Sequence, residues 1–193
     1  NEMTTAKRNT IVLVMLISAF VAMLNQTILN TALPAIIKGL NITETTAQWL
    51  ITGFMLVNGI MIPLTAFLMD KYTTRKLYIF SMAAFLIGSI IAALSPGFEI
   101  LMVARIIQAI GAGILLPLMQ FTVFTLFPVE KRGFAMGLTG IVAQTAPAIG
   151  PTLTGLLIDF FSWRMPFYIV AAIALIAFAT VSYTHLTLPT SDL

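Results

Sequence analysis

The chain has 193 residues, of which 59% are hydrophobic and 9% are charged, and its formal net charge is +3. Soluble domains carry about 25% charged residues, so this inventory cannot supply a water-soluble surface. The sequence contains no cysteine, which excludes disulfides, a thiolate nucleophile and zinc–thiolate sites. The composition therefore predicts a protein whose main solvent is the lipid bilayer.

Six apolar segments are long enough to cross the hydrocarbon core, which takes about 20 residues. They are too long for barrel strands and lack alternating polarity, so we expect helices. The connections are short, which forces neighbouring helices to run antiparallel. We predict an all-α, polytopic membrane fold in which six transmembrane helices occupy residues 11–182. The expected spans are Ile11–Leu33, Thr46–Met69, Leu77–Leu94, Ile100–Leu126, Phe134–Ile158 and Met165–Ser182.

Basic residues are distributed unevenly between the two ends of these spans. One side carries Lys7, Arg8, Lys71, Arg75, Lys76, Lys131 and Arg132, and the other carries Lys38 and Arg164. Basic loops stay in the cytoplasm, so we expect residues 1–10 to be cytoplasmic and the protein to lie in a bacterial inner (plasma) membrane. Residues 183–193 lack a basic cluster and resemble translated adapter sequence. We interpret them as a non-native or truncated tail, the alternative being a short polar terminus.

Arg105 is the one charged residue inside a predicted span. A guanidinium at membrane depth costs at least about 2.5–3.5 kcal/mol, and such residues usually mark a substrate or coupling pathway. Gln108, Ala109 and Ala112 follow at spacings of three, four and seven residues, on the same helical face. This face predicts an internal polar cavity. The alternatives are a structural pairing with another helix or snorkelling of the side chain to the interface.

Carboxamides cluster near the end of the first span, at Asn25, Gln26 and Asn30. Polar groups in lipid need partners, so they either contact substrate or hydrogen-bond between helices. The fifth span contains Gln144, and its two prolines, Pro147 and Pro151, each remove a helical hydrogen bond. We expect a bent helix that lines a cavity, although close packing would also account for its glycines.

The connection after the second span carries Asp70, Lys71, Arg75 and Lys76. One carboxylate among three cations can form a charge lock between two helices. The alternative is that these residues only anchor the helices at the cytoplasmic surface.

Taken in order, these segments resemble the major facilitator superfamily, and more closely its fourteen-span drug:proton antiporter branch. The charged connection resembles the family's Gly-x-x-x-Asp-Arg-x-Gly-x-Arg-Lys motif, and Arg105, Gln108, Gly111 and Gly113 resemble Arg-x-x-Gln-Gly-x-Gly. Gly150, Pro151 and Gly155 resemble the antiporter motif Gly-Pro-x-x-Gly-Gly. The first span resembles Leu-Asp-x-Thr-Ile-Val-Asn-x-Ala-Leu-Pro, and the segment from Ser162 to Ile169 resembles Ser-Trp-Arg-Trp-x-Phe-x-Ile.

The sequence departs from these patterns at several positions. Asn25 stands where the branch usually has aspartate, so a titratable group of the first span is absent. Other departures replace motif glycines, at Ala66, Thr73, Ala109 and Thr154.

The resemblance implies a secondary transporter built from two six-helix halves, of which this chain matches the N-terminal one. It implies export of drug-like or amphipathic small molecules by proton antiport, with the missing C-terminal half as partner. Arg105 and Gln108 would serve proton coupling or switching, and the charged connection would serve gating. Asn25, Gln26, Asn30 and Gln144 would line the cavity. The alternatives are a same-fold transporter of a specific metabolite, or a six-span membrane partner protein that does not transport.

Enzymatic chemistry is not expected. The sequence has no Gly-x-Ser-x-Gly and no paired intramembrane carboxylates, and its one histidine, His185, lies in the tail. It has no nucleotide-binding loop of the Gly-x-x-x-x-Gly-Lys type either. We expect no metal, no cofactor and no nucleic-acid partner.

Overall fold

The computed structural model describes the backbone of residues 5–187 and the side chains of residues 8–180. Within this range every regular element is a helix, which confirms the predicted all-α membrane fold. The elements are α1 (Thr5–Leu40), α2 (Glu44–Lys71), α3 (Thr74–Leu94), α4 (Phe98–Leu126), the 3-10 turn η1 (Val129–Lys131), α5 (Arg132–Phe160) and α6 (Met165–Thr187).

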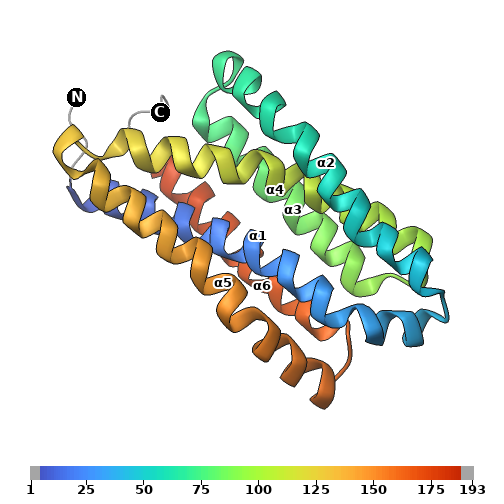
Figure 1. Ribbon diagram of the computed structural model, residues 1–193. Helices are drawn as coiled ribbons and strands as arrows, with labels where there is room; N and C mark the ends of the chain where they lie inside the picture. The colour runs from blue at the N-terminus through green and yellow to red at the C-terminus, as the bar shows by residue number, and fades with distance from the viewer. Residues whose placement is uncertain (1–4, 188–193) are drawn as a thin grey trace.

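The helices form one elongated bundle in which chain neighbours run antiparallel (Figure 1). The α2–α3 and α4–α5 connections lie at the same end as the start of α1, as the six-span prediction requires. Helices α1 to α5 are each long and apolar enough to cross a membrane. Helix α6 is apolar over Met165–Thr180, and its backbone continues to Thr187 through part of the predicted tail. Residues 188–193 of that tail lie outside the described residues.

Helix α1 is longer than the predicted first span because it continues through Pro34. We expected a connection to begin at this proline, yet the apolar residues that follow keep the helix intact to Leu40. A proline removes one backbone donor, and the buried side chain of Ile36 still packs into the core. The helix ends at Asn41, which adopts a left-handed conformation with φ 55°, while the amide of Ile42 donates to the carbonyl of Ile37 at 3.2 Å.

Two threonine side chains cap the N-termini of α2 and α3, which follow short connections. The Oγ1 atom of Thr43 accepts from the amide of Thr46 at 3.1 Å at the start of α2. The Oγ1 atom of Thr73 accepts from the amide of Lys76 at 3.2 Å at the start of α3. A side-chain acceptor at this position satisfies a backbone donor that has no partner within the helix. Thr73, which replaces a glycine of the resembled motif, therefore has a local structural role here.

Helix α4 is the centre of the bundle, because it packs against α3, α2 and α1. Helix α1 also packs against α5 and α6, and α6 covers α3. By contrast, α2 and α5 bury a much smaller share of their apolar 18-residue stretch than α1, α3 and α4 do. These two helices thus present large apolar surfaces that must meet lipid or further protein.

Glycines allow α3 and α4 to approach each other closely. A Cβ atom at Gly111 would lie 2.6 Å from the backbone oxygen of Ser81 and 2.8 Å from the backbone nitrogen of Phe85. A Cβ atom at Gly88 would lie 2.9 Å from the carbonyl oxygen of Ala104. Backbone atoms cannot rotate away as a side chain can, so both positions require glycine. Small residues of this kind are the usual means of close helix packing in lipid.

We expect Gly111→Val to separate α3 from α4 and to lower the free energy of unfolding by about 1–3 kcal/mol, the usual cost of overpacking. The measurement is the thermal unfolding midpoint of the full-length protein in detergent. Gly137→Val is the matched control, because nothing lies within 4 Å of a Cβ atom built at Gly137. Equal midpoints for the two variants would contradict the close-packing role of Gly111.

Candidate functional site

Arg105 is the largest of the fully buried side chains, with 1% of its surface exposed. Helix α4 carries it into the bundle on the face that also buries Gln108, Ala109 and Ala112, so the sequence placed these residues on one face correctly. An ion in this position needs close partners, because burying a charged side chain at membrane depth is costly.

The Arg105 guanidinium has two partners within the described part of the chain. Its Nη1 donates to Oε1 of Gln108 at 3.1 Å. Its Cζ lies 4.2 Å from the centroid of the Phe54 ring on α2, a cation–π contact. Its Nε is buried and has no hydrogen-bond partner in the described chain. A guanidinium carries several N–H donors, so Arg105 keeps donor capacity that these contacts do not use.

Gln108 connects this cation to two other helices. Its Nε2 donates to Oγ of Ser89 on α3 at 3.0 Å and to Oδ1 of Asn25 on α1 at 3.4 Å. Ser89 in turn donates to the carbonyl of Phe85 at 2.8 Å. Gln108 thus holds its amide oxygen toward Arg105 and its amide nitrogen toward α1 and α3. The four residues Arg105, Gln108, Asn25 and Ser89 form a buried polar network across three helices.

A cavity of about 410 Å³ opens beside Arg105 between α1, α2 and α4. This volume is within the usual range of small-molecule sites, about 300–1,000 Å³. Its polar lining consists of three carboxamides and one guanidinium, and it contains no carboxylate. The lining residues are Gln26, Leu29, Asn30, Ile51, Phe54, Met55, Asn58, Gly59, Ile62 and Arg105.

The carboxamides expected to line a cavity occupy different places in the structure. Gln26 and Asn30 line the cavity beside Arg105. Asn25 is completely buried behind it, where it accepts from Gln108 while its own Nδ2 has no partner among the described residues. Gln144 is exposed on α5 and does not border this cavity.

The motif residues of α5 also divide into two groups. A Cβ atom at Gly150 would contact the side chains of Thr27 and Leu24 on α1, so this glycine lets α5 approach α1. Nothing lies within 4 Å of a Cβ atom at Gly155, and Pro151 is exposed. Helix α5 remains continuous from Arg132 to Phe160 through both prolines.

The charged connection lies at the end of α2, apart from the Arg105 cavity. Asp70, Lys71 and Lys76 are exposed, and Arg75 is half-buried. The ammonium of Lys71 lies 4.7 Å from the centroid of the Phe67 ring. No ion pair links Asp70 to these cations in the part of the chain that the structure describes, so the expected charge lock has no partner within this bundle.

Besides the apolar lining of the cavity, the site includes Asn58, Phe54 and Ser89, which were not among the predicted residues. Asn58 is a carboxamide inside the apolar second span, a signal that the sequence did contain. Its Oδ1 is buried and has no partner among the described residues. Phe54 and Ser89 carry no sequence signal that separates them from ordinary core residues. Their roles follow from the placement of α2 and α3 next to Arg105.

Comparison with known proteins places this architecture in a family. The sequence model of the Major Facilitator Superfamily matches residues 15–192. Among curated proteins, the chain is 53% identical over 175 residues to the uncharacterized MFS-type transporter YcnB of Bacillus subtilis, covering 91% of this chain and 37% of YcnB. It is 44% identical over 159 residues to the lincomycin resistance protein LmrB of the same organism, covering 82% of this chain and 33% of LmrB.

Among solved structures, the peptide transporter POT (E310Q mutant) in complex with sulfate superposes with a TM-score of 0.81 at 14% identity. The match covers 90% of this chain and 37% of the POT chain. At 14% identity it shows a shared fold and nothing more. The chain spans about a third of the length of the curated relatives described above. The match of the family model over residues 15–192 shows that this integral membrane chain belongs to the major facilitator superfamily.

Proposed function

We propose that this chain is the N-terminal six-helix half of a secondary transporter that exports amphipathic small molecules by proton antiport. Family membership indicates a transporter rather than an enzyme. The name of the relative LmrB, a lincomycin resistance protein, favours export of a drug-like compound. The observation that carries the proposal is Arg105, a buried cation that borders a cavity and keeps unused donors.

The lining of the Arg105 cavity suits an amphipathic substrate. Leu29, Ile51 and Ile62 offer apolar surface, while Gln26, Asn30 and Asn58 offer amides for polar substituents. Such a mixture of apolar surface and a few polar groups is typical of small-molecule sites. Because three amides line the cavity, a polar metabolite is the alternative substrate.

Proton coupling needs a group that binds and releases a proton. Among the described residues the acidic ones are Glu44, Asp70, Glu99, Glu130 and Asp159, and all of them are exposed near helix ends. The side chain of Asn25 is an amide, so it cannot act as the proton-binding group. We infer that the proton-binding carboxylate belongs to the C-terminal half and that its charged form pairs with the unused donors of Arg105. Protonation of that carboxylate would release Arg105 and so couple proton binding to rearrangement.

The arrangement in the membrane follows from the charges. We propose that the end of the bundle with the α2–α3 and α4–α5 connections faces the cytoplasm of a bacterial inner membrane. The apolar surfaces of α2 and α5 would then meet the C-terminal half, and the charged connection, with Asp70, would find its partners there. Gly150, Pro151 and Gly155 would allow α5 to move against α1 during transport.

We expect Arg105→Ala in the full-length transporter to reduce proton-driven efflux at least tenfold, because the buried cation and its contacts are lost. Efflux of ethidium and resistance to lincomycin are measured in cells with a matched expression level. Arg105→Lys keeps the charge but loses the planar geometry, and we expect an intermediate loss. Undiminished efflux by Arg105→Ala would overturn the role of Arg105. Efflux that persists after the proton gradient is collapsed would overturn antiport.

Gln108→Leu tests the network that positions Arg105. The substitution leaves the buried Nη1 of Arg105 and Oδ1 of Asn25 without their hydrogen bonds to Gln108, at about 1–3 kcal/mol for a lost buried hydrogen bond. We expect the initial rate of efflux to fall about tenfold at the same expression level. Gln120→Leu is the matched control, since Gln120 is an exposed carboxamide on the same helix. Similar rates in both variants would show that the network does not contribute to transport.

A further inference from the structure

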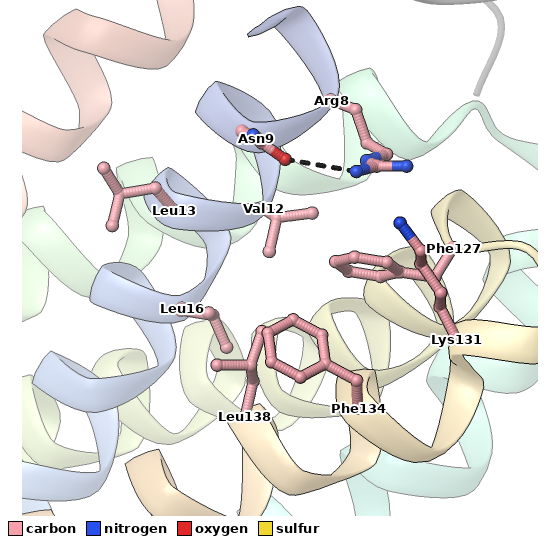
Figure 2. Close-up of a pocket in the computed structure, with 9 residues that line it drawn as sticks. All are labelled: Arg8, Asn9, Val12, Leu13, Leu16, Phe127, Lys131, Phe134 and Leu138. Carbon is pink, nitrogen blue, oxygen red and sulfur yellow. Dashed lines mark hydrogen bonds between the residues drawn. The ribbon is translucent and has the colours of Figure 1, made fainter. Parts of the chain in front are cut away.

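Two cavities of the bundle are lined by an arginine, and they differ in the acceptors that they contain. The cavity at the basic end has a volume of about 670 Å³, and its lining includes Arg8, Phe127 and Lys131 (Figure 2). There Cζ of Arg8 lies 4.8 Å from the centroid of the Phe127 ring. No side-chain oxygen of that lining is buried without a partner among the described residues, whereas the cavity beside Arg105 has such an oxygen, Oδ1 of Asn58.

Arg105 and Asn58 leave complementary groups unused on the wall of one cavity. Nε of Arg105 is a buried donor and Oδ1 of Asn58 is a buried acceptor, and neither has a hydrogen-bond partner among the described residues. Both residues line the cavity of about 410 Å³. A buried polar group without a partner carries the full cost of its desolvation, and this cost is larger for a charged group. An arrangement that joins the donor to the acceptor is therefore favoured.

The oxygen of Asn58 is enclosed by this bundle itself. It lies 3.2 Å from the position that a Cβ atom at Gly113 of α4 would take, so the amide fits there because Gly113 has no side chain. The same Cβ position is 2.5 Å from Cβ of Met61, and Thr65 donates to the carbonyl of Gly113 at 3.1 Å. These contacts hold α2 against α4. The unused acceptor is thus a property of this half of the transporter and does not depend on what covers the outer face of α2.

Phe54 and Asn58 provide two successive positions for a guanidinium along α2. They are four residues apart, so their Cβ atoms lie about 5–6 Å apart on one face of the helix. Cζ of Arg105 lies 4.2 Å from the centroid of the Phe54 ring, which is the first position. A move of one helical turn, about 5.4 Å, takes the guanidinium from the ring to the amide. Changes in the χ angles of Arg105 and Asn58 are enough for this move, so neither helix has to shift.

We propose that Asn58 is a positioning residue that acts as the second partner of Arg105. In the first position, Phe54 and Gln108 hold the guanidinium. In the second, Arg105 donates to Oδ1 of Asn58. A cation with a partner in both positions can move without being left unpaired at membrane depth. This exchange involves α2 and α4 and is independent of the identity of the substrate.

The exchange has a consequence for transport that rests on the proposed function. In that cycle, protonation of the carboxylate of the C-terminal half releases Arg105, and Asn58 then accepts the released guanidinium. Asn58 also lines the wall that offers amides to the substrate. Once Arg105 occupies this wall, the amide of Asn58 is no longer available to a substrate. Proton binding therefore disfavours substrate binding, as antiport requires.

A double-mutant cycle in the full-length protein tests the exchange. Phe54→Leu removes the ring of the first position, and Asn58→Leu removes the acceptor of the second. After either single change Arg105 can still use the other position, but the double variant leaves it neither. We expect the double variant to lower the thermal unfolding midpoint in detergent by about 3 °C more than the two single variants together.

Arg105→Leu provides the control background for this cycle, because a leucine needs no acceptor. In that background the effects of Phe54→Leu and Asn58→Leu should add. Additive effects with Arg105 present would overturn the exchange. Non-additive effects that persist without Arg105 would also overturn it, since they would reflect a direct contact between two neighbours on α2.

Asn58→Asp tests the same exchange by introducing a charge of nearly the same shape. At alkaline pH a buried carboxylate without a partner destabilises the fold, whereas one that Arg105 can reach forms an ion pair. We expect the unfolding midpoint to fall in the Arg105→Leu background and not to fall when Arg105 is present. Equal losses in the two backgrounds would show that Arg105 does not reach position 58 and would overturn the proposal.

Efflux of ethidium at matched expression tests the consequence for transport. We expect Asn58→Leu to lower the initial rate about fivefold, the effect of one lost hydrogen bond, and Asn58→Gln, which keeps an acceptor, to lower it less. An unchanged rate in Asn58→Leu would overturn the role of the exchange in transport. Absence of efflux by the wild-type protein would instead overturn the proposed function, and the unfolding midpoints would still decide whether the exchange occurs.

Discussion

A buried guanidinium needs protein partners, and the side chains of four helices supply the contacts around Arg105. Helix α2 contributes the Phe54 ring, α4 contributes Gln108, and Gln108 is itself held by Ser89 of α3 and Asn25 of α1. Removing one member of such a network leaves the others unsatisfied, which costs more than the lost bond itself. The network therefore links α1, α3 and α4, and the Phe54 contact adds α2.

Close contact between helices makes this network possible. Gly111 and Gly88 allow the backbones of α3 and α4 to lie close together. As a result, Oγ of Ser89 lies 3.0 Å from Nε2 of Gln108. Thr65 adds a similar link, because its Oγ1 donates to the carbonyl of Gly113 at 3.1 Å across the α2–α4 contact. Since lipid provides little hydrophobic force between helices, packing and such hydrogen bonds must hold the bundle together.

Charge is divided between two places along the bundle. At membrane depth one cation, Arg105, lies among amides and keeps donors that its contacts do not use. At the basic end Arg8 and Lys131 lie beside apolar side chains. The two cavities share no lining residue.

The sequence by itself determined the number and type of the helices, because about 20 apolar residues in a row leave no other structure for the backbone in lipid. It also determined that Arg105 and Gln108 share a face, since a spacing of three residues has this consequence in any helix. Caps and helix ends were less predictable: Pro34 suggested a connection, but the apolar residues after it continued α1 to Leu40.

Only the tertiary structure decided which residues surround Arg105. The pairing of Gln108 with Asn25, 83 residues apart, and the contact with Phe54 depend on how α1, α2 and α4 pack, which no local pattern encodes. The same packing left Gln144 exposed and brought Arg8 next to Phe127 and Lys131. Helical periodicity specifies the face on which a residue lies, whereas the neighbour of that face is set by the close contacts of the whole bundle.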